Sequence, residues 1–156
     1  MDIETQEMSE WCWAAVSVSV DRFFNPGSGV RQCDVAQQVL NSNSNCCGNK
    51  QACNEPALLQ DALKAVRRFK DAVGRRLRFS EIQTEIDVRR SPVCVRIEWE
   101  EGGGHFVMID QFIELTSGDQ LVHVLDPLYP NSLVHYDDFV SEYQGDGRWT
   151  GTFFVS

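Results

Sequence analysis

The sequence predicts an α+β domain in which helices come first and an antiparallel sheet follows. Apolar residues between positions 11 and 69 recur with helical spacing, whereas from residue 93 onward they alternate with polar ones. A chain that groups its helices before its strands is typical of the α+β class. We therefore expect a helical half over about residues 1–90, a β half over 91–156, and a cleft between them.

Size and charge restrict the class of protein. The 156 residues, 42% of them hydrophobic, suit a single domain over residues 1–156 with its own core. The net charge of −9 argues against a nucleic-acid partner, because phosphates are bound by clustered cations. No apolar run approaches the roughly 20 residues that a membrane helix needs, so no membrane partner is expected. Residues 64–90 carry a net charge of +5, which we interpret as pairing with nearby acidic groups, with a docking patch as the alternative.

Four segments of the helical half have helical apolar spacing, and three of them also have residues that start or end a helix. The first is apolar on every face, which indicates a buried central helix that stops before Asn25-Pro26-Gly27. The third has Asn54 as its expected N-cap, and the fourth opens at Ser80, which with Gln83 resembles a capping box. The expected helices cover about residues 11–24, 30–40, 54–69 and 80–88.

The β half changes to a period of two. Residues 93–99 alternate apolar and polar side chains, and Ser117-Gly118-Asp119 is the turn between the next two strands. The expected strands cover residues 93–99, 106–115, 121–125 and 149–155, with a short helix at 137–143.

The six cysteines are unevenly distributed. Cys46, Cys47 and Cys53 share one loop-like window, and Cys33 is the nearest other cysteine. Adjacent cysteines do not easily bond to each other, so we expect two disulfides among these four with only the Cys46–Cys47 pairing excluded. A zinc site is the competing interpretation, but CxxC spacing and a nearby histidine are both missing, so we expect no metal.

Disulfides favour an oxidising compartment or export from the cell. Met1-Asp2-Ile3-Glu4 has neither the basic nor the apolar region of a signal peptide. A removed leader, a leaderless route and a larger polypeptide all stay open.

Cys12 stands apart from the other cysteines. It opens the apolar first helix, where the unpaired N–H groups and the helix dipole favour the thiolate, which is the nucleophilic form. A buried, inert cysteine is the structural alternative.

His105 and Asp126 are the candidate partners of Cys12. Gly102-Gly103-Gly104 precedes His105 at the mouth of an apolar strand and leaves the imidazole accessible. Asp126 ends the next strand, and an antiparallel pairing can bring its carboxylate beside the ring. The amide of Gln6, six positions before Cys12, can reach an oxyanion beside the sulfur. A rim histidine and a turn-forming Asp-Pro are the alternatives.

The segment around Cys12 resembles the active-site segment of papain-like cysteine proteases. There a glutamine is followed by five residues and then by Cys-Trp-Ala at the head of the central helix, as Gln6 is followed by Cys12-Trp13-Ala14 here. The Trp-Cys-Trp-Ala-Ala form, the cysteine loop at 46–54, the Gly-Gly-His-Phe-Val segment and the Leu-Asp-Pro ending look most like bacterial members. These include secreted effector proteases of plant pathogens and, more distantly, peptidase domains of bacteriocin exporters. The resemblance spans about residues 6–127.

The resemblance implies a papain-like fold with a Cys-His-Asp triad. Cys12 would be the nucleophile, His105 the general base and then acid, and Asp126 the orienting residue. Gln6 and the backbone N–H of Cys12 would form the oxyanion hole. Two departures stand out: Ser9-Glu10-Trp11 replaces a common Cys-Gly-Ser, and Asp126 replaces the asparagine of most plant and animal members.

The leading hypothesis is therefore a cysteine endopeptidase that cleaves a specific protein through an acyl-enzyme and uses no cofactor. The resemblance implies a bacterial effector or toxin, secreted or delivered into a target cell, with a protein substrate. A cognate immunity or inhibitor protein that occupies the cleft is the expected partner if the target is another bacterium. The alternatives are a deamidase or acyltransferase with the same triad and a non-catalytic, disulfide-stabilised binding domain.

Overall fold

The computed structural model describes residues 1–156 and confirms the α+β class. None of its helices combines the length and the apolar character needed to cross a bilayer. The helices are α1 (Cys12–Phe24), α2 (Gln32–Leu40), α3 (Leu59–Ala65), α4 (Phe79–Gln83) and α5 (Tyr136–Glu142), with a 3-10 turn η1 (Lys50–Cys53) and a π turn η2 (Thr84–Val88).

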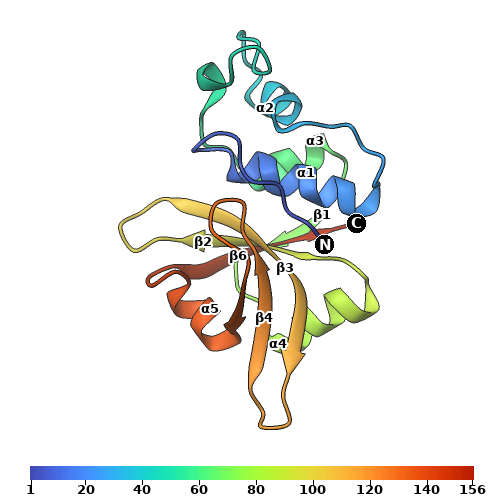
Figure 1. Ribbon diagram of the computed structural model, residues 1–156, viewed down its shortest axis with the longest axis vertical. Helices are drawn as coiled ribbons and strands as arrows, with labels where there is room; N and C mark the ends of the chain where they lie inside the picture. Colours follow the sequence, from blue (N-terminus) through green and yellow to red (C-terminus); the bar gives the residue numbers. More distant parts are fainter.

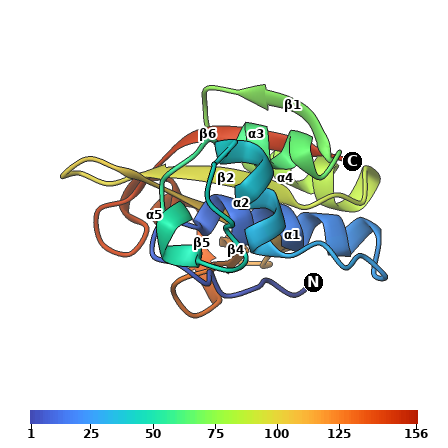
Figure 2. The same ribbon diagram turned by 90° about the horizontal axis from the view of Figure 1, so that it is seen from above.

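The strands form one antiparallel sheet of six in the order β1-β6-β2-β3-β4-β5. Helices α1–α3 lie over one face of this sheet, and α4 and α5 lie against the other (Figure 1). Both chain ends lie on the same side of the molecule in both views (Figure 2). The strands are β1 (Phe69–Val73), β2 (Val93–Glu98), β3 (Gly104–Glu114), β4 (Gln120–Leu125), β5 (Ser132–His135) and β6 (Arg148–Val155).

The two faces of the sheet bury separate cores. Along β3, Phe106 and Met108 belong to the core under α1–α3, whereas Val107 and Ile109 belong to the core with α4 and α5. Because both faces are buried here, the apolar residues of β3 from Phe106 to Ile109 form a continuous run and do not alternate with polar ones.

Helix α1 is the central element that the sequence predicts. Its residues from Cys12 to Asp21 are all buried, as expected of a helix that is apolar on every face. Its buried Ser17 and Ser19 donate their hydroxyls to carbonyl groups of the preceding turn, so these polar groups are satisfied inside the helix.

The expected third helix is shorter than its apolar pattern suggests. α3 ends at Ala65, and Arg67 then adopts a left-handed backbone with φ 61°, which no helix can continue. Phe69, expected on the helix, instead begins β1. Leu58, expected on the apolar stripe, is 66% exposed.

Asn54 does not cap α3. Its amide oxygen instead accepts the N–H of Glu10 at 2.9 Å, and its amide nitrogen donates to the Ser9 hydroxyl at 2.8 Å. The side chain thus serves a contact between distant segments. At α4 the expected capping residue is also displaced, because the Glu81 carboxylate accepts the N–H of Arg78 at 2.9 Å and Ser80 lies inside the first turn.

Two strands, β1 and β5, are additional to those expected. β1 pairs with β6, so residues 69–73 belong to the sheet and the helical half ends well before the expected boundary at residue 90. α4 and η2 likewise lie on the sheet's second face. Both strands are short, and their side chains are mostly exposed or half-buried, which weakens the sequence pattern.

The connection between α2 and α3 contains both disulfides. Cys33 is bonded to Cys47 and Cys46 to Cys53, which confirms two disulfides among the four clustered cysteines. Cys12 and Cys94 are free and buried.

Four of the nine basic residues between positions 64 and 90, namely Arg68, Arg75, Arg78 and Arg89, form ion pairs with acidic groups, which agrees in part with the simpler interpretation. Arg75 lies 2.9 Å from Glu81, and Arg89 lies 2.7 Å from Glu85. Arg68 lies 2.9 Å from Asp21 of α1.

Replacing Cys46 and Cys53 by serine should lower the free energy of unfolding by about 2–3 kcal/mol, because a disulfide mainly restricts the unfolded chain. The Cys33–Cys47 disulfide closes a longer segment, with a sequence separation of 14 residues against 7. Its removal should therefore lower the free energy of unfolding slightly more. Urea unfolding at pH 7 measures both effects. Cys12→Ser, which keeps both disulfides, is the matched control, and an unfolding free energy equal to the control's would contradict the prediction.

Candidate active site

Neighbouring strands bring His105 and Asp126 together. His105 is the second residue of β3, and Asp126 directly follows β4, which pairs antiparallel with β3. Nε2 of the imidazole lies 2.8 Å from Oδ1 of the carboxylate, and both residues are 4% exposed. The contact expected from the sequence is therefore present.

Further donors hold the Asp126 carboxylate. The backbone N–H groups of Leu128 and Tyr129 donate to Oδ1 at 2.8 and 3.0 Å, and the Tyr143 hydroxyl donates to Oδ2 at 2.6 Å. Burial alone would raise the pKa of Asp126, but the hydrogen bonds from His105 and Tyr143 lower it below its usual value. The carboxyl group is thus ionised at neutral pH. Because a carboxylate only accepts hydrogen bonds, Nε2 of His105 carries a proton.

Cys12 lies close enough to His105 for its thiol to influence the pKa of the imidazole. It is the first residue of α1, its thiol is free, and it is 9% exposed. Burial would lower the pKa of His105, but hydrogen bonding to Asp126 and to Cys12 outweighs burial and raises it to about 9. Since Nε2 faces Asp126, Nδ1 is the nitrogen left to face the sulfur.

The first turn of α1 offers free hydrogen-bond donors beside the sulfur. The backbone N–H groups of Cys12, Trp13 and Ala14 have no backbone acceptor, and neither Trp11 nor an acidic residue caps this end. Free N–H groups at a helix N-terminus stabilise an adjacent negative charge. The start of α1 can therefore stabilise a thiolate or an oxyanion.

Gln6 is oriented differently from the sequence expectation. Its amide nitrogen donates to the carbonyl groups of Met8 and Ser9 at 3.0 and 2.8 Å, which uses both of its N–H bonds. Its amide oxygen is buried without a partner. The physical reason is the tight turn before α1, which places both carbonyl groups within reach of the amide. The backbone N–H of Gln6 donates to Pro127 at 2.9 Å and ties this segment to the turn after Asp126.

Aromatic rings surround the imidazole. Trp99 is stacked on His105 with ring centroids 5.9 Å apart and an interplanar angle of 21°. Tyr129 meets the same ring edge-on at 6.2 Å. Tyr143, whose hydroxyl reaches Asp126, is 2% exposed. None of the three was expected in the site; only Trp99, close before the glycine-rich turn, carried a signal that could have suggested it.

Two other tryptophans, Trp13 and Trp149, belong to the cores. Trp13 is 1% exposed and Trp149 is 5% exposed, and they lie in different core clusters. Large aromatic side chains mostly fill interiors, as observed here.

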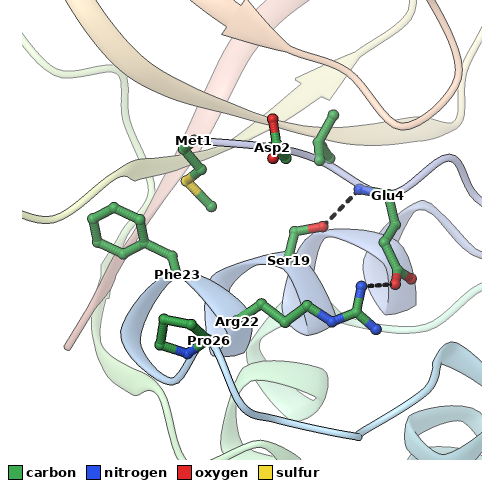
Figure 3. Close-up of a pocket in the computed structure, with 8 residues that line it drawn as sticks. Met1, Asp2, Glu4, Ser19, Arg22, Phe23 and Pro26 are labelled. Atoms are coloured by element: carbon green, nitrogen blue, oxygen red, sulfur yellow. Dashed lines mark hydrogen bonds and ion pairs between the residues drawn. The ribbon is translucent and has the colours of Figure 1, made fainter.

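A further hollow lies away from this site. It measures about 380 Å³ and lies between the N-terminal segment and the far end of α1 (Figure 3). Phe23 in its lining follows Cys12 by eleven residues, roughly 16 Å along the helix axis. Glu4 crosses this hollow to contact Ser19 and Arg22. No cysteine or histidine lines it, so the contacts at Cys12 define the better candidate site.

One group of side chains has ligands suited to a metal ion. Cys33, Asp34 and Cys47 offer their ligand atoms within 4.8 Å of one another. Both sulfurs are joined in a disulfide, however, and a disulfide sulfur is not the thiolate that binds metals. The residues present do not fit a metal site.

No protein family matches the sequence, and no curated protein matches it closely enough to identify a relative. The chemistry of the site therefore carries the functional proposal.

The imidazole of His105 should titrate near pH 9, and Asp126→Asn should lower that midpoint by about one pH unit or more, because a neutral amide no longer favours the imidazolium. The Cε1–H resonance followed by NMR from pH 5 to 10.5 measures both. Tyr143→Phe is the matched control, since it removes a hydrogen bond to Asp126 but keeps the charge. A midpoint near 6.5 in the unmodified protein would contradict the prediction.

Iodoacetamide should label Cys12 and leave Cys94 unmodified in the folded protein. Cys94 is fully buried, and burial raises the pKa of its thiol far above the usual value. Mass spectrometry of the alkylated peptides at pH 7 distinguishes the two sites. Cys94→Ser should keep the full labelling and Cys12→Ser should abolish it; preferential labelling of Cys94 would count against the prediction.

Proposed function

We propose that the protein is a cysteine endopeptidase with a papain-like fold. In this proposal Cys12 is the nucleophile, His105 moves the proton, and Asp126 orients the imidazole. The observation that supports it most is the buried hydrogen bond between Asp126 and His105, together with the effect of the Cys12 thiol, at the start of α1, on the pKa of that imidazole. A thiol, an imidazole and a carboxylate in this order are the groups that acyl transfer through a covalent intermediate requires.

In the first half of the reaction, the Cys12 thiolate attacks the carbonyl carbon of the scissile peptide and forms a carbon–sulfur bond. The imidazolium of His105 then gives its proton to the amide nitrogen as the carbon–nitrogen bond breaks. An imidazolium that persists to about pH 9 can supply this proton at neutral pH. The amine product leaves, and the acyl group stays on the sulfur.

In the second half, neutral His105 takes a proton from water while the water oxygen attacks the thioester carbon. The tetrahedral intermediate collapses, the carbon–sulfur bond breaks, and the carboxylic acid product leaves. Cys12 returns to the thiolate, paired with imidazolium. Asp126 stays ionised throughout and stabilises the positive ring.

The oxyanion of each tetrahedral intermediate needs hydrogen-bond donors. The backbone N–H of Cys12 has no backbone acceptor and is placed at the head of α1, so it suits this role. Gln6 can contribute only if its amide releases Met8 or Ser9, because both of its N–H bonds are engaged. We therefore assign the backbone N–H the main part and Gln6 a part that depends on this rearrangement.

The two disulfides support maturation outside a reducing cytosol, which agrees with a protein that is secreted or delivered to another cell. We include in the proposal a bacterial effector or toxin role, a specific protein substrate, and an immunity or inhibitor protein that covers the cleft. These parts derive from the resemblance of residues 6–127 to bacterial papain-like proteases.

The proposal is tested by sequencing new protein N-termini in candidate target lysates treated with the protein or with Cys12→Ala. New N-termini that depend on Cys12 support an endopeptidase. Ammonia release without new N-termini would replace it by a deamidase. If neither new N-termini nor ammonia are found and Cys12→Ala keeps full biological activity, the protein is a binding domain and the endopeptidase proposal is wrong.

On a peptide found in that way, Cys12→Ala and His105→Ala should each reduce kcat/KM by about 10⁴-fold or more. For Asp126→Ala the reduction in kcat/KM should be roughly 100-fold smaller than for either of these variants, because packing still provides part of the orientation of the imidazole. Asp126→Asn should retain more activity than Asp126→Ala, since its amide oxygen can still accept the Nε2–H of His105. Initial rates measure this order, with the folding of each variant checked by circular dichroism. An equal loss of kcat/KM in folded Asp126→Ala and in Cys12→Ala would contradict the predicted ranking.

A further inference from the structure

A cavity of about 330 Å³ is lined by two of the aromatic residues that surround His105. Two of its walls are the rings of Trp99 and Tyr129, which both contact His105. In both views the β2–β3 turn and the α5–β6 connection, which form its rim, extend to the side on which α1 begins (Figures 1 and 2). The residues that line it are Trp99, Glu101, Gly102, Tyr129, Gln144 and Asp146.

The charged groups of this cavity are all acidic and all unpaired. Neither Glu101 nor Asp146 forms an ion pair or a side-chain hydrogen bond, and no lysine or arginine is part of the lining. The guanidinium of Arg96 on β2 is engaged by Glu98 and Thr150, and Arg148, two residues after Asp146, is exposed and lies outside the lining. The cavity therefore combines aromatic faces with free carboxylates, and this combination attracts an organic cation.

We propose that this cavity binds the side chain of a lysine or arginine of the substrate, on the leaving-group side of the scissile bond. The inference rests on the proposed endopeptidase function and adds a substrate class to it. Its placement follows from the imidazole, which gives its proton to the leaving amine and carries Trp99 on its ring. A substrate residue just after the cleaved bond thus passes beside Trp99.

The shape of the rim supports a preformed site. Glu101 precedes Gly102 and Gly103, whose φ angles of 97° and 82° belong to the left-handed region that glycine adopts without strain. Asp146 follows Gly145, whose φ of 101° lies in the same region. Both carboxylates are therefore carried by tight turns, which limits the conformational entropy lost when a cation binds.

A binding experiment tests the cavity without catalysis. The Cys12→Ala protein is titrated with N-acetyl-arginine methylamide and with its uncharged citrulline counterpart, while NMR follows the Trp99 indole N–H. The arginine probe should bind up to about fivefold more tightly than the citrulline probe, as expected for an ion pair near a protein surface. Adding Glu101→Gln and Asp146→Asn should remove this difference. Glu100→Gln, the exposed neighbour in the same turn, should leave it unchanged.

A cleavage experiment tests the position. New N-termini produced by the unmodified protein should be enriched in lysine or arginine within the first two residues after the cut. The double variant Glu101→Gln/Asp146→Asn should lose this enrichment. The control variant Glu100→Gln should keep it. Equal binding of the two probes, or enrichment only before the cut, would overturn the inference. Selective arginine binding without any cleavage would contradict the endopeptidase function but support the cation site in the cavity. Cleavage without a preference for basic residues would support the endopeptidase function and contradict the cation site.

Discussion

The buried carboxylate of Asp126 is the group on which the rest of the site depends. It lies where water does not reach, so its charge is stable only because His105, two backbone N–H groups and the Tyr143 hydroxyl converge on it. These donors come from β3, from the turn after β4 and from the end of α5. One charge thus fixes three segments relative to one another and holds the imidazole in its protonated form.

The opposite wall of the site is held by contacts from the helical layer. The Trp11 indole, next to Cys12, donates to the carbonyl of Cys53 at 2.8 Å, inside the loop that the disulfides close. Gln6 joins the same segment to the turn after Asp126. The N-terminal end of α1, which carries Cys12, is therefore attached both to the disulfide loop and to the sheet, and the candidate site lies where the two layers meet.

Agreement between sequence and structure depends on how local each signal is. The buried helix α1 and the alternating strands β2 and β3 were predictable, because their apolar spacing reflects burial over many consecutive residues. Phe69 was misplaced, because the apolar stripe continues past the left-handed Arg67 and the strand pairing that captures Phe69 involves β6, far away in the chain. Asn54 has the character of a cap but is used by Glu10, a contact that no local pattern reports.

Periodicity, composition and motif spacing were sufficient to predict the class of fold, the four cysteines that pair and the residue types able to form a Cys-His-Asp site. The pairing of the cysteines, the stacking of Trp99 on the imidazole, the hydrogen bond from Tyr143 to Asp126 and the turning of the Gln6 amide towards its own loop became known only from the folded structure. Hydrogen bonds and ring contacts depend on distances of a few ångströms between segments that are remote in the chain. Such distances exist only after both layers have packed against the sheet.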